Sequence, residues 1–278
     1  MTEIKQQRAK AERFRAMHRG GEILLLPNAW DAASARIFAQ AGFGAIATTS
    51  AGIAFSLGYP DGQRISREEM LGTVKRIAAA VKVPVTADVE AGYGNRPEDA
   101  ARTARSVIES GAVGMNLEDA TGDKGNPLAD LSLQLEKIAE VKEAGQKAEV
   151  PLVLNAKTDV YLLEVGPPEK RYDEAVRRLA AFRDAGADCV FAPGVYDRET
   201  IGRLVKDLVC PVNILAGPVC PSASELQALG VARVSLGSWA MRTTLGVLQK
   251  IAKELRSTGT YKTLSDAPPF AEINRLME

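Results

Sequence analysis

Carboxylates follow two successive apolar runs in a pattern suited to a divalent cation. The run at 83–86 leads into Asp88 and Glu90, and a glycine-rich turn follows at 91–94. The next apolar run ends at Glu118. In a continuing strand, Asp88 and Glu90 would point the same way, and Glu118 would arrive from the neighbouring strand. Three carboxylates without histidine or thiolate favour Mg²⁺, with Mn²⁺ as the alternative.

A structural role for these carboxylates is the competing hypothesis. Asp88 would then cap the turn that follows it, and Glu118 would pair with an arginine at the rim. Both hypotheses require parallel strands that end together at one edge of a sheet.

Strand-like apolar runs alternate with amphipathic helical stretches along the chain, which is typical of βα units around a parallel sheet. Eight such units predict an α/β fold, a single (β/α)8 TIM barrel domain over residues 1–278 with an N-terminal helix and a C-terminal helical extension. A doubly wound sheet is the alternative, but no GxGxxG or P-loop is present. The predicted strands are 23–27, 44–49, 83–88, 114–118, 152–156, 189–192, 212–216 and 233–236.

The composition argues against several classes of partner. The chain has 278 residues, with 35 acidic and 35 basic side chains, so its formal net charge is zero. Without a basic run or a long apolar stretch, we expect no nucleic acid partner, no membrane partner and a cytoplasmic location. The three cysteines have no CxxC spacing, which argues against disulfides and structural zinc. His18, the only histidine, is expected on the surface, so histidine triads are excluded.

Active sites of (β/α)8 barrels lie where the strands end and the βα loops begin. The predicted strand ends are also where this sequence is polar. The polar residues there are Asn28, Asp31, Thr48, Thr49, Ser50, Asp88, Glu90, Glu118, Asp119, Asn155, Lys157, Asp159 and Asn213.

Several motifs occur in an order that resembles one known superfamily. They are Pro27-Asn28-Ala29-Trp30-Asp31, Ser56-Leu57-Gly58-Tyr59-Pro60-Asp61, Asp88-Val89-Glu90-Ala91-Gly92-Tyr93-Gly94, Leu117-Glu118-Asp119 and Lys157-Thr158-Asp159, followed by Pro211–Leu215 and Val234–Ser238. This order resembles the isocitrate lyase/phosphoenolpyruvate mutase superfamily over nearly the whole chain. The resemblance implies a (β/α)8 barrel that binds Mg²⁺ and a 2-oxo or related carboxylate. It also implies C–C or P–C bond chemistry through enolate-like intermediates.

The resemblance implies roles for individual residues. Asp88, Glu90 and Glu118 would form the metal site, partly through water, with Asp61 beside the metal or simply in a turn. Lys157 stands where the family generally has arginine, which keeps the charge but loses bidentate geometry. Asn213 would donate to a substrate carboxylate, or it is a satisfied asparagine at the rim. The implied substrate-binding residues are Thr49, Ser50, Ala51, Gly52, Lys157 and Asn213.

The loop after the fourth predicted strand departs from the isocitrate and methylisocitrate lyases. Those members carry a Lys-Lys/Arg-Cys-Gly-His loop there, whereas residues 120–127 contain no cysteine or histidine. Ordinary activity of either kind is therefore not expected. Lys124 and Asn126 have a spacing similar to the Lys-x-Asn of phosphoenolpyruvate mutases, although a solvated lysine in a mobile loop is the alternative. Tyr93, Lys124 and a metal-bound water are the candidates for acid–base chemistry.

These residues predict an enzyme, a Mg²⁺-dependent carbon–carbon lyase that cleaves or decarboxylates a small 2-oxo- or 2-hydroxy-(di)carboxylate through a metal-stabilised enolate. The loop at 121–128 would close over the substrate. One alternative is the P–C bond chemistry of phosphoenolpyruvate mutase or phosphonopyruvate hydrolase, and another is a non-catalytic oxo-acid-binding protein. The resemblance further implies a homotetramer or homodimer that exchanges the C-terminal helices from about residue 240.

Overall fold

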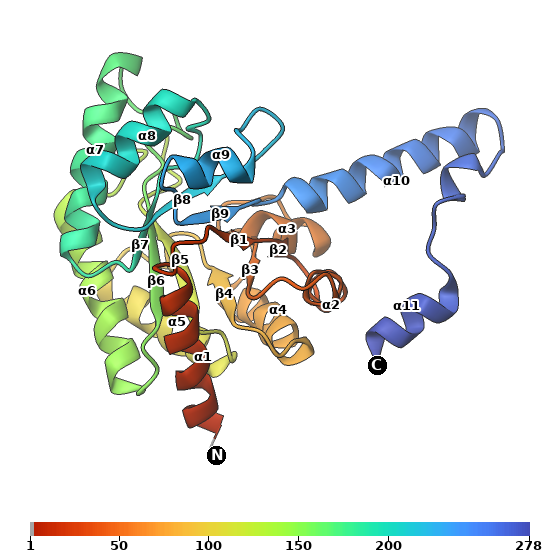
Figure 1. The fold of residues 1–278 in the computed structure, drawn as a ribbon, viewed down its shortest axis with the longest axis horizontal. Helices are drawn as coiled ribbons and strands as arrows, with labels where there is room; N and C mark the ends of the chain where they lie inside the picture. The colour runs from red at the N-terminus through yellow and green to blue at the C-terminus, as the bar shows by residue number, and fades with distance from the viewer. Residues whose placement is uncertain (1–2) are drawn as a thin grey trace.

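Parallel strands form a barrel with helices packed around it (Figure 1). The computed structural model describes residues 3–278. Nine strands pair in the order β1-β9-β8-β7-β6-β5-β4-β3-β2. β1 (Leu24–Leu26) pairs with β9 (Arg233–Ser235), and β2 (Asn28–Ala29) pairs with β3 (Ile46–Thr48). The other strands are β4 (Val85–Asp88), β5 (Gly114–Glu118), β6 (Val153–Lys157), β7 (Cys189–Phe191) and β8 (Val212–Leu215).

The first predicted strand closes the ring. Pro27 lies between β1 and β2, and the two halves pair with opposite neighbours, so together they occupy one position of the barrel. The Pro27 carbonyl still accepts a hydrogen bond from the Ala47 amide at 2.9 Å, although proline has no N–H to donate. The predicted (β/α)8 barrel is confirmed.

Local sequence determines where several helices begin. At the start of α2, Asp31 accepts a hydrogen bond from the Ser34 amide at 2.7 Å. Ser66 and Glu69 form a capping box before α4, and Pro97 opens α5. The helices after α1 are α2 (Ala32–Gln40), α3 (Ser50–Ser56), α4 (Arg67–Ala80), α5 (Pro97–Glu109), α6 (Leu131–Lys147), α7 (Pro168–Asp184), α8 (Arg198–Leu208) and α9 (Ala223–Ala228).

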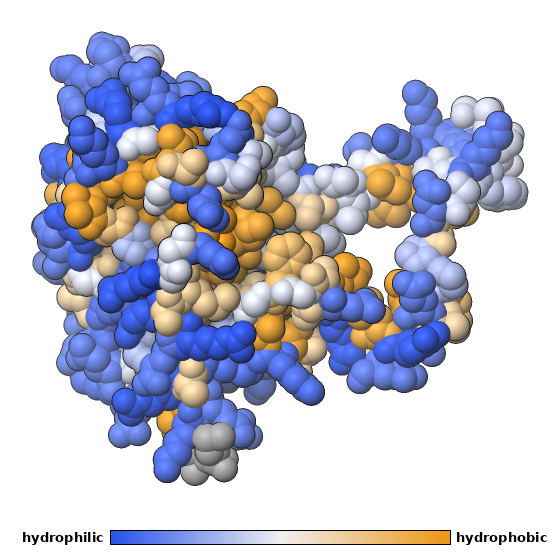
Figure 2. Space-filling view, viewed as in Figure 1, coloured by the Kyte–Doolittle hydropathy of each residue, from blue (hydrophilic) through white to orange (hydrophobic). Residues whose placement is uncertain are grey.

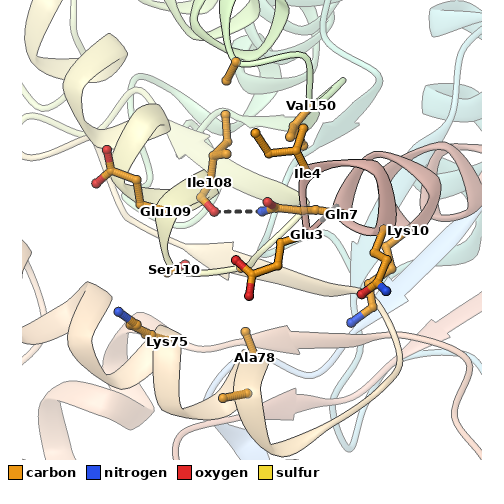
Figure 3. Close-up of a pocket in the computed structure, with 14 residues that line it drawn as sticks. Glu3, Ile4, Gln7, Lys10, Lys75, Ala78, Ile108, Glu109, Ser110 and Val150 are labelled. Atoms are coloured by element: carbon orange, nitrogen blue, oxygen red, sulfur yellow. Dashed lines mark hydrogen bonds between the residues drawn. The ribbon is translucent and has the colours of Figure 1, made fainter. Parts of the chain in front are cut away.

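Helix α1 (Glu3–Met17) lies at the end of the barrel where the strands begin. Phe14 is fully buried and packs so closely on Gly114, the first residue of β5, that a Cβ there would lie 2.9 Å from the ring. Gln7 fastens the helix by donating to the carbonyls of Ile108 and Ala112, at 2.7 and 3.0 Å. A hollow of about 570 Å³ lies beside this contact (Figure 3).

His18 lies under α1 and not on the surface, so the prediction for this residue is wrong. Its side chain is 5% exposed, its ring meets Phe14 edge-on at 4.8 Å, and Nδ1 lies 2.9 Å from the Phe14 carbonyl. Burial, and then the charge of Arg233, lower the pKa of His18 to about 4. The charged residues beside it in sequence concealed this buried position.

The C-terminal segment leaves the barrel as an arm (Figure 1). Helix α10 (Trp239–Ser257) projects outward, a short 3-10 turn (Lys262–Leu264) follows, and α11 (Phe270–Met277) returns to α2, where Arg36 donates to the Leu276 carbonyl at 2.9 Å. Apolar side chains remain exposed along the arm, with Phe270 84% exposed (Figure 2). Within residues 3–278, no helix combines the length and apolar character that crossing a membrane requires. Exchange of the arm between subunits stays a prediction.

Candidate active site

A cavity of about 280 Å³ opens at the carboxyl ends of the strands, which is the catalytic end of this fold. Six of the residues predicted for the site line it: Thr49, Ser50, Ala51, Asp61, Asp88 and Lys157. The larger hollow beside α1 lies at the opposite end of the strands and is lined mainly by helix residues (Figure 3). We therefore assign the chemistry to the smaller cavity.

Asp88, the last residue of β4, is held from two sides. One carboxylate oxygen accepts hydrogen bonds from the Ser50 amide and hydroxyl, at 3.0 and 2.9 Å. The other accepts from the Asn116 side chain at 3.2 Å. The Asp88 amide donates to the Thr48 hydroxyl at 2.9 Å, which fixes the backbone as well. The oxygen that accepts from Asn116 has one lone pair left for a ligand in the cavity, whereas the oxygen that faces Ser50 already accepts two hydrogen bonds.

Glu90 reaches its position through a turn and not through a continuing strand. β4 ends at Asp88, and Glu90 has φ +53°, in the left-handed region that a residue with a side chain rarely adopts. The expectation that Asp88 and Glu90 point the same way from one continuing strand is therefore wrong, because the strand ends at Asp88. Glu90 is 4% exposed and accepts a hydrogen bond from the Gln63 amide at 2.6 Å. Such strain concentrates at functional sites.

Asp61, Asp88 and Glu90 form a carboxylate cluster that lacks a matching positive charge. Burial, and then the negative charges of Asp61 and Asp88, raise the pKa of Glu90 to about 7. Burial and then Asp88 raise the pKa of Asp61 in the same way. The Lys157 ammonium opposes both shifts without cancelling them. A bound cation would relieve this repulsion.

Glu118 and Lys157 form an ion pair across β5 and β6, where they occupy paired positions. Lys157 also lies 3.1 Å from Asp159. Burial alone would lower the pKa of Lys157, but Asp159, Glu118 and Asp88 together raise it well above its usual value. Burial raises the pKa of Glu118, and the neighbouring Lys157 offsets part of that effect. Lys157 is therefore a charged side chain that is already committed to two carboxylates.

The carboxylate cluster fits a hydrated divalent cation better than a bare one. In the part of the chain from residue 3 onward, no three acidic, histidine or cysteine side chains come close enough to enclose a metal ion. Asp61 and Asp88 nevertheless face the cavity together, all donors are oxygen atoms, and their mutual repulsion favours a positive charge. Mg²⁺ commonly keeps several waters and takes only one or two carboxylates, which suits this arrangement.

Several other predicted residues lie around the cavity without lining it. The Gly52 amide, in the first turn of α3, donates to the Thr49 hydroxyl at 3.3 Å. Tyr93 has φ +56°, and its buried hydroxyl has no hydrogen-bond partner among residues 3–278. Asn213 is fully buried inside the barrel and donates to Ser235 at 3.1 Å. Its amide therefore lies below the cavity.

Lys124 and Asn126 lie on the loop after β5 with exposed side chains, and neither lines the cavity. The loop is tied at its base, where Thr121 donates to the Pro127 carbonyl and Ala129 donates to the Asp119 carbonyl, at 3.0 and 2.8 Å. No cysteine or histidine enters the site from this loop.

The sequence reasoning missed much of the cavity wall, because it selected only some of the polar residues at the strand ends and no apolar ones. Asn28 was named among the polar strand-end residues. The other wall residues not proposed for the site are Asn116, Leu162, Phe191, Pro193, Tyr196, Leu215, Ser235, Leu236, Gly237, Ser238, Trp239 and Arg242. Phe191 ends β7 and Leu215 ends β8, so the position rule applied to every strand would have found them. Arg242 lies one turn into α10, where no strand-end signal points to it.

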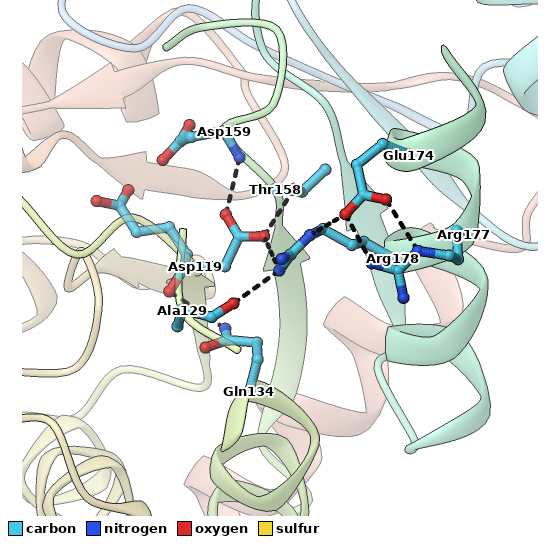
Figure 4. A network of polar contacts seen from close by, with 9 residues as sticks. Asp119, Ala129, Gln134, Thr158, Asp159, Glu174, Arg177 and Arg178 are labelled. Atoms are coloured by element: carbon cyan, nitrogen blue, oxygen red, sulfur yellow. Dashed lines mark hydrogen bonds and ion pairs between the residues drawn. The ribbon is translucent and has the colours of Figure 1, made fainter. Parts of the chain in front are cut away.

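A second polar network lies directly behind the site (Figure 4). Asp119 is fully buried, and it accepts hydrogen bonds from the Thr158 hydroxyl and the Asp159 amide, at 2.7 and 2.9 Å. Arg178 on α7 forms an ion pair with Asp119 at 3.1 Å and also donates to the Ala129 carbonyl at 3.0 Å. The network joins the ends of β5 and β6 to the base of the loop at 120–129. It therefore supports Glu118 and Lys157 from behind.

The sequence profile of the phosphoenolpyruvate phosphomutase family matches residues 14–256. This chain belongs to that family. A Mycobacterium tuberculosis protein of uncharacterized role is 34% identical over 260 residues, which is 94% of each chain. The 2-methylisocitrate lyase of Bacillus subtilis is 31% identical over 216 residues, covering 76% of this chain and 67% of that one.

Solved structures agree with the family assignment. A Burkholderia cenocepacia protein superposes with a TM-score of 0.92 and 41% identity, over 98% of this chain and 96% of that one. A 2,3-dimethylmalate lyase of the phosphoenolpyruvate mutase/isocitrate lyase superfamily superposes with a TM-score of 0.84 and 28% identity, over 96% of this chain and 94% of that one. A phosphonopyruvate hydrolase in complex with oxalate and Mg²⁺ superposes with a TM-score of 0.84 and 25% identity, over 96% of this chain and 94% of that one. The chain is thus an enzyme of this superfamily of lyases and mutases.

Proposed function

We propose that this protein is a Mg²⁺-dependent lyase that cleaves or decarboxylates a small 2-oxo- or 2-hydroxy-(di)carboxylate. The observation that carries the proposal is the cluster of Asp61, Asp88 and Glu90 at the catalytic end of the barrel, with two of its members lining a cavity of about 280 Å³. The Mg²⁺ of the phosphonopyruvate hydrolase supports the choice of ion. Mn²⁺ is the alternative ion.

Asp88 and Asp61 would hold the metal, with Glu90 and Glu118 contributing through water. The metal would supply Lewis-acid stabilisation of negative charge on the substrate oxygens. Ser50 is fixed against Asp88 by two hydrogen bonds, so its backbone and that of Ala51 present a pre-positioned wall for the substrate carboxylate. Lys157 adds positive charge on the same side of the cavity, shared with Glu118 and Asp159.

The loop at 120–130 brings no acid–base side chain to the cavity wall, because neither Lys124 nor any other loop residue lines it, and this favours reactions that need little proton abstraction. Loss of CO₂ needs none, and retro-aldol cleavage needs removal of the hydroxyl proton alone. Tyr93 is the remaining side-chain candidate near the cluster, because burial and then Glu90 raise the pKa of its hydroxyl and keep it protonated as a donor.

Phosphoryl–carbon chemistry is the second candidate, favoured by the likeness to phosphonopyruvate hydrolase. It would require Lys124 and Asn126 to reach the substrate through a movement of their loop. A non-catalytic oxo-acid-binding protein is the third candidate, and failure to bind Mg²⁺ would favour it. We retain the cytoplasmic location and a homotetramer or homodimer as parts of the proposal.

The test is pyruvate release from a panel of substrates with Mg²⁺: oxaloacetate, other 2-oxo acids, 2-methylisocitrate and phosphonopyruvate. Glu118→Ala removes a predicted metal-site carboxylate, and Asp123→Ala is the matched control on the exposed loop. Release from a carboxylate that is lost in Glu118→Ala and kept in Asp123→Ala supports the proposal. Release from phosphonopyruvate alone transfers support to the second candidate.

A further inference from the structure

Arg242 is the one cation on the cavity wall that is not already paired within residues 3–278. The charged wall residues are Asp61, Asp88, Lys157 and Arg242. Lys157 is committed to Glu118 and Asp159, whereas no ion pair in the described chain includes Arg242. Arg242 is exposed at the cavity, so its donors are hydrated when no ligand is bound and are free to form charge-assisted hydrogen bonds with an anion that enters.

The Arg242 side chain is positioned by its own helix. Its guanidinium carbon lies 4.4 Å from the centre of the Trp239 ring, and the Arg242 amide donates to the Ser238 carbonyl at 2.8 Å. Stacking uses the face of the guanidinium and leaves the N–H groups at its edge free to donate. An arginine held in this way suits a planar carboxylate.

The cavity wall also carries apolar side chains, among them Leu162, Phe191, Pro193 and Leu215, together with polar ones such as Tyr196 and Ser235. Asp61, Asp88 and Arg242 all line the same cavity, and Arg242 comes from α10, an element separate from those that carry the two carboxylates. A ligand that fills the cavity is therefore within the same walls as the carboxylate cluster and Arg242.

We propose that Arg242 binds the distal carboxylate of the substrate and thereby selects short dicarboxylates over monocarboxylates. This inference rests on the proposed function, in which the other end of the substrate binds at the carboxylate cluster. A second carboxylate entering a semi-enclosed, partly apolar cavity loses hydration, and a charge-assisted pair with arginine offsets that loss.

The position of Arg242 also favours one of the two reactions. In retro-aldol cleavage of a 2-hydroxy dicarboxylate, the hydroxyl proton passes to a water molecule, the C2–O bond becomes a carbonyl and the C2–C3 bond breaks. The electron pair passes to C3, is delocalised onto the distal carboxylate, and C3 then takes a proton from water. Negative charge grows on the group that Arg242 would hold, whereas decarboxylation removes that group as CO₂. Arg242 therefore favours cleavage of the C2–C3 bond.

The experiment compares malate with lactate, which lacks the distal carboxylate, by calorimetric titration of the full chain with Mg²⁺. Arg242→Gln should weaken malate binding by about 10- to 100-fold and leave lactate and oxalate within about twofold, because oxalate occupies only the metal end. The malate affinity of Arg242→Lys should lie between those of Arg242→Gln and the unaltered protein. Arg256→Gln, on the exposed far end of the same helix, is the control.

Equal malate affinity in Arg242→Gln and the unaltered protein would overturn the inference while leaving the proposed function in place. Equal weakening of malate, lactate and oxalate would also overturn it, because the change would then disturb the whole site. If the unaltered protein binds none of the three with Mg²⁺, the proposed function fails and the inference fails with it.

Discussion

Asp119 and Glu90 are both buried carboxylates of this barrel, but the charges that surround them differ. At Asp119, burial raises the pKa to about 6, while Thr158, the Asp159 amide and Arg178 all oppose the shift. At Glu90, burial raises the pKa to about 7, and the two strongest neighbouring effects, from Asp61 and Asp88, add to it. The first group is balanced within the chain and the second is not.

This difference separates structural acids from functional ones better than burial does. The Asp119 network binds strands, helix α7 and a loop base together, and every partner it needs comes from the described chain (Figure 4). The carboxylate cluster of Asp61, Asp88 and Glu90 keeps a surplus of negative charge at a cavity. A surplus of that kind costs stability and is retained where a ligand supplies the opposite charge.

Among substitutions of polar residues, Asp119→Ala should cause the largest loss of stability. It leaves the buried Arg178 guanidinium paired with Glu174 alone and removes the acceptor of the Thr158 hydroxyl and the Asp159 amide, so we expect a loss of about 3 kcal/mol in the free energy of unfolding. Urea denaturation measures it, and Asp173→Ala, on the same helix as Arg178, is the surface control. A loss below about 1 kcal/mol would mean that Asp119 is not a structural hub.

Asp88→Asn should have the opposite effects: a large loss of activity and no loss of stability. We expect activity with Mg²⁺ to fall by about 10²–10³-fold, because charge stabilisation in the transition state is lost. In the absence of Mg²⁺ the free energy of unfolding should stay equal or rise, because repulsion with Asp61 and Glu90 is relieved. Activity assays and urea denaturation without metal test both halves. If Asp88→Asn is inactive because it is unstable, the distinction between Asp88 and the structural Asp119 is wrong.

His18 extends the comparison to a buried group at the other end of the barrel. Its pKa is lowered to about 4 in the folded protein, against 6.5 as the ordinary value, so the unfolded chain binds the proton more readily between these values. Stability is therefore fully present above about pH 6.5 and falls as the pH drops towards 4, by up to about 3 kcal/mol.

Denaturation of the unaltered protein and of His18→Gln at a series of pH values isolates this contribution. The two curves should diverge between about pH 6.5 and pH 4, with the unaltered protein losing more stability. Parallel curves over that interval would show that the imidazole does not titrate as a buried group.

Lys124→Ala and Asn126→Ala should have the smallest effects. Both side chains are exposed and lie off the cavity wall, so we expect carboxylate cleavage to change by less than about twofold and stability by less than about 0.5 kcal/mol. Steady-state kinetics of each variant checks this. A loss of turnover on phosphonopyruvate would instead bring the loop into the site and favour the P–C alternative.

The sequence predicted the barrel well because its signal is repetitive. The strand over Gly114–Glu118 is found with its predicted bounds, and the others differ by one or two residues at an end. Alternation of buried apolar strands with amphipathic helices leaves few architectures to choose from. Exposure of a single residue was harder to predict, as His18 shows, because its neighbours in sequence do not share its environment.

By itself the sequence determined the fold class, the family and the set of acidic residues near the strand ends, because these depend on residue type and order along the chain. Tertiary structure alone decided which acids are balanced. Arg178, 59 positions from Asp119, forms an ion pair with it, whereas Lys157, the cation that acts on Asp61 and Glu90, is paired with Glu118 and Asp159. It also placed Arg242 on the cavity wall. Charge balance depends on distances between elements that are remote in sequence, and folding alone sets those distances.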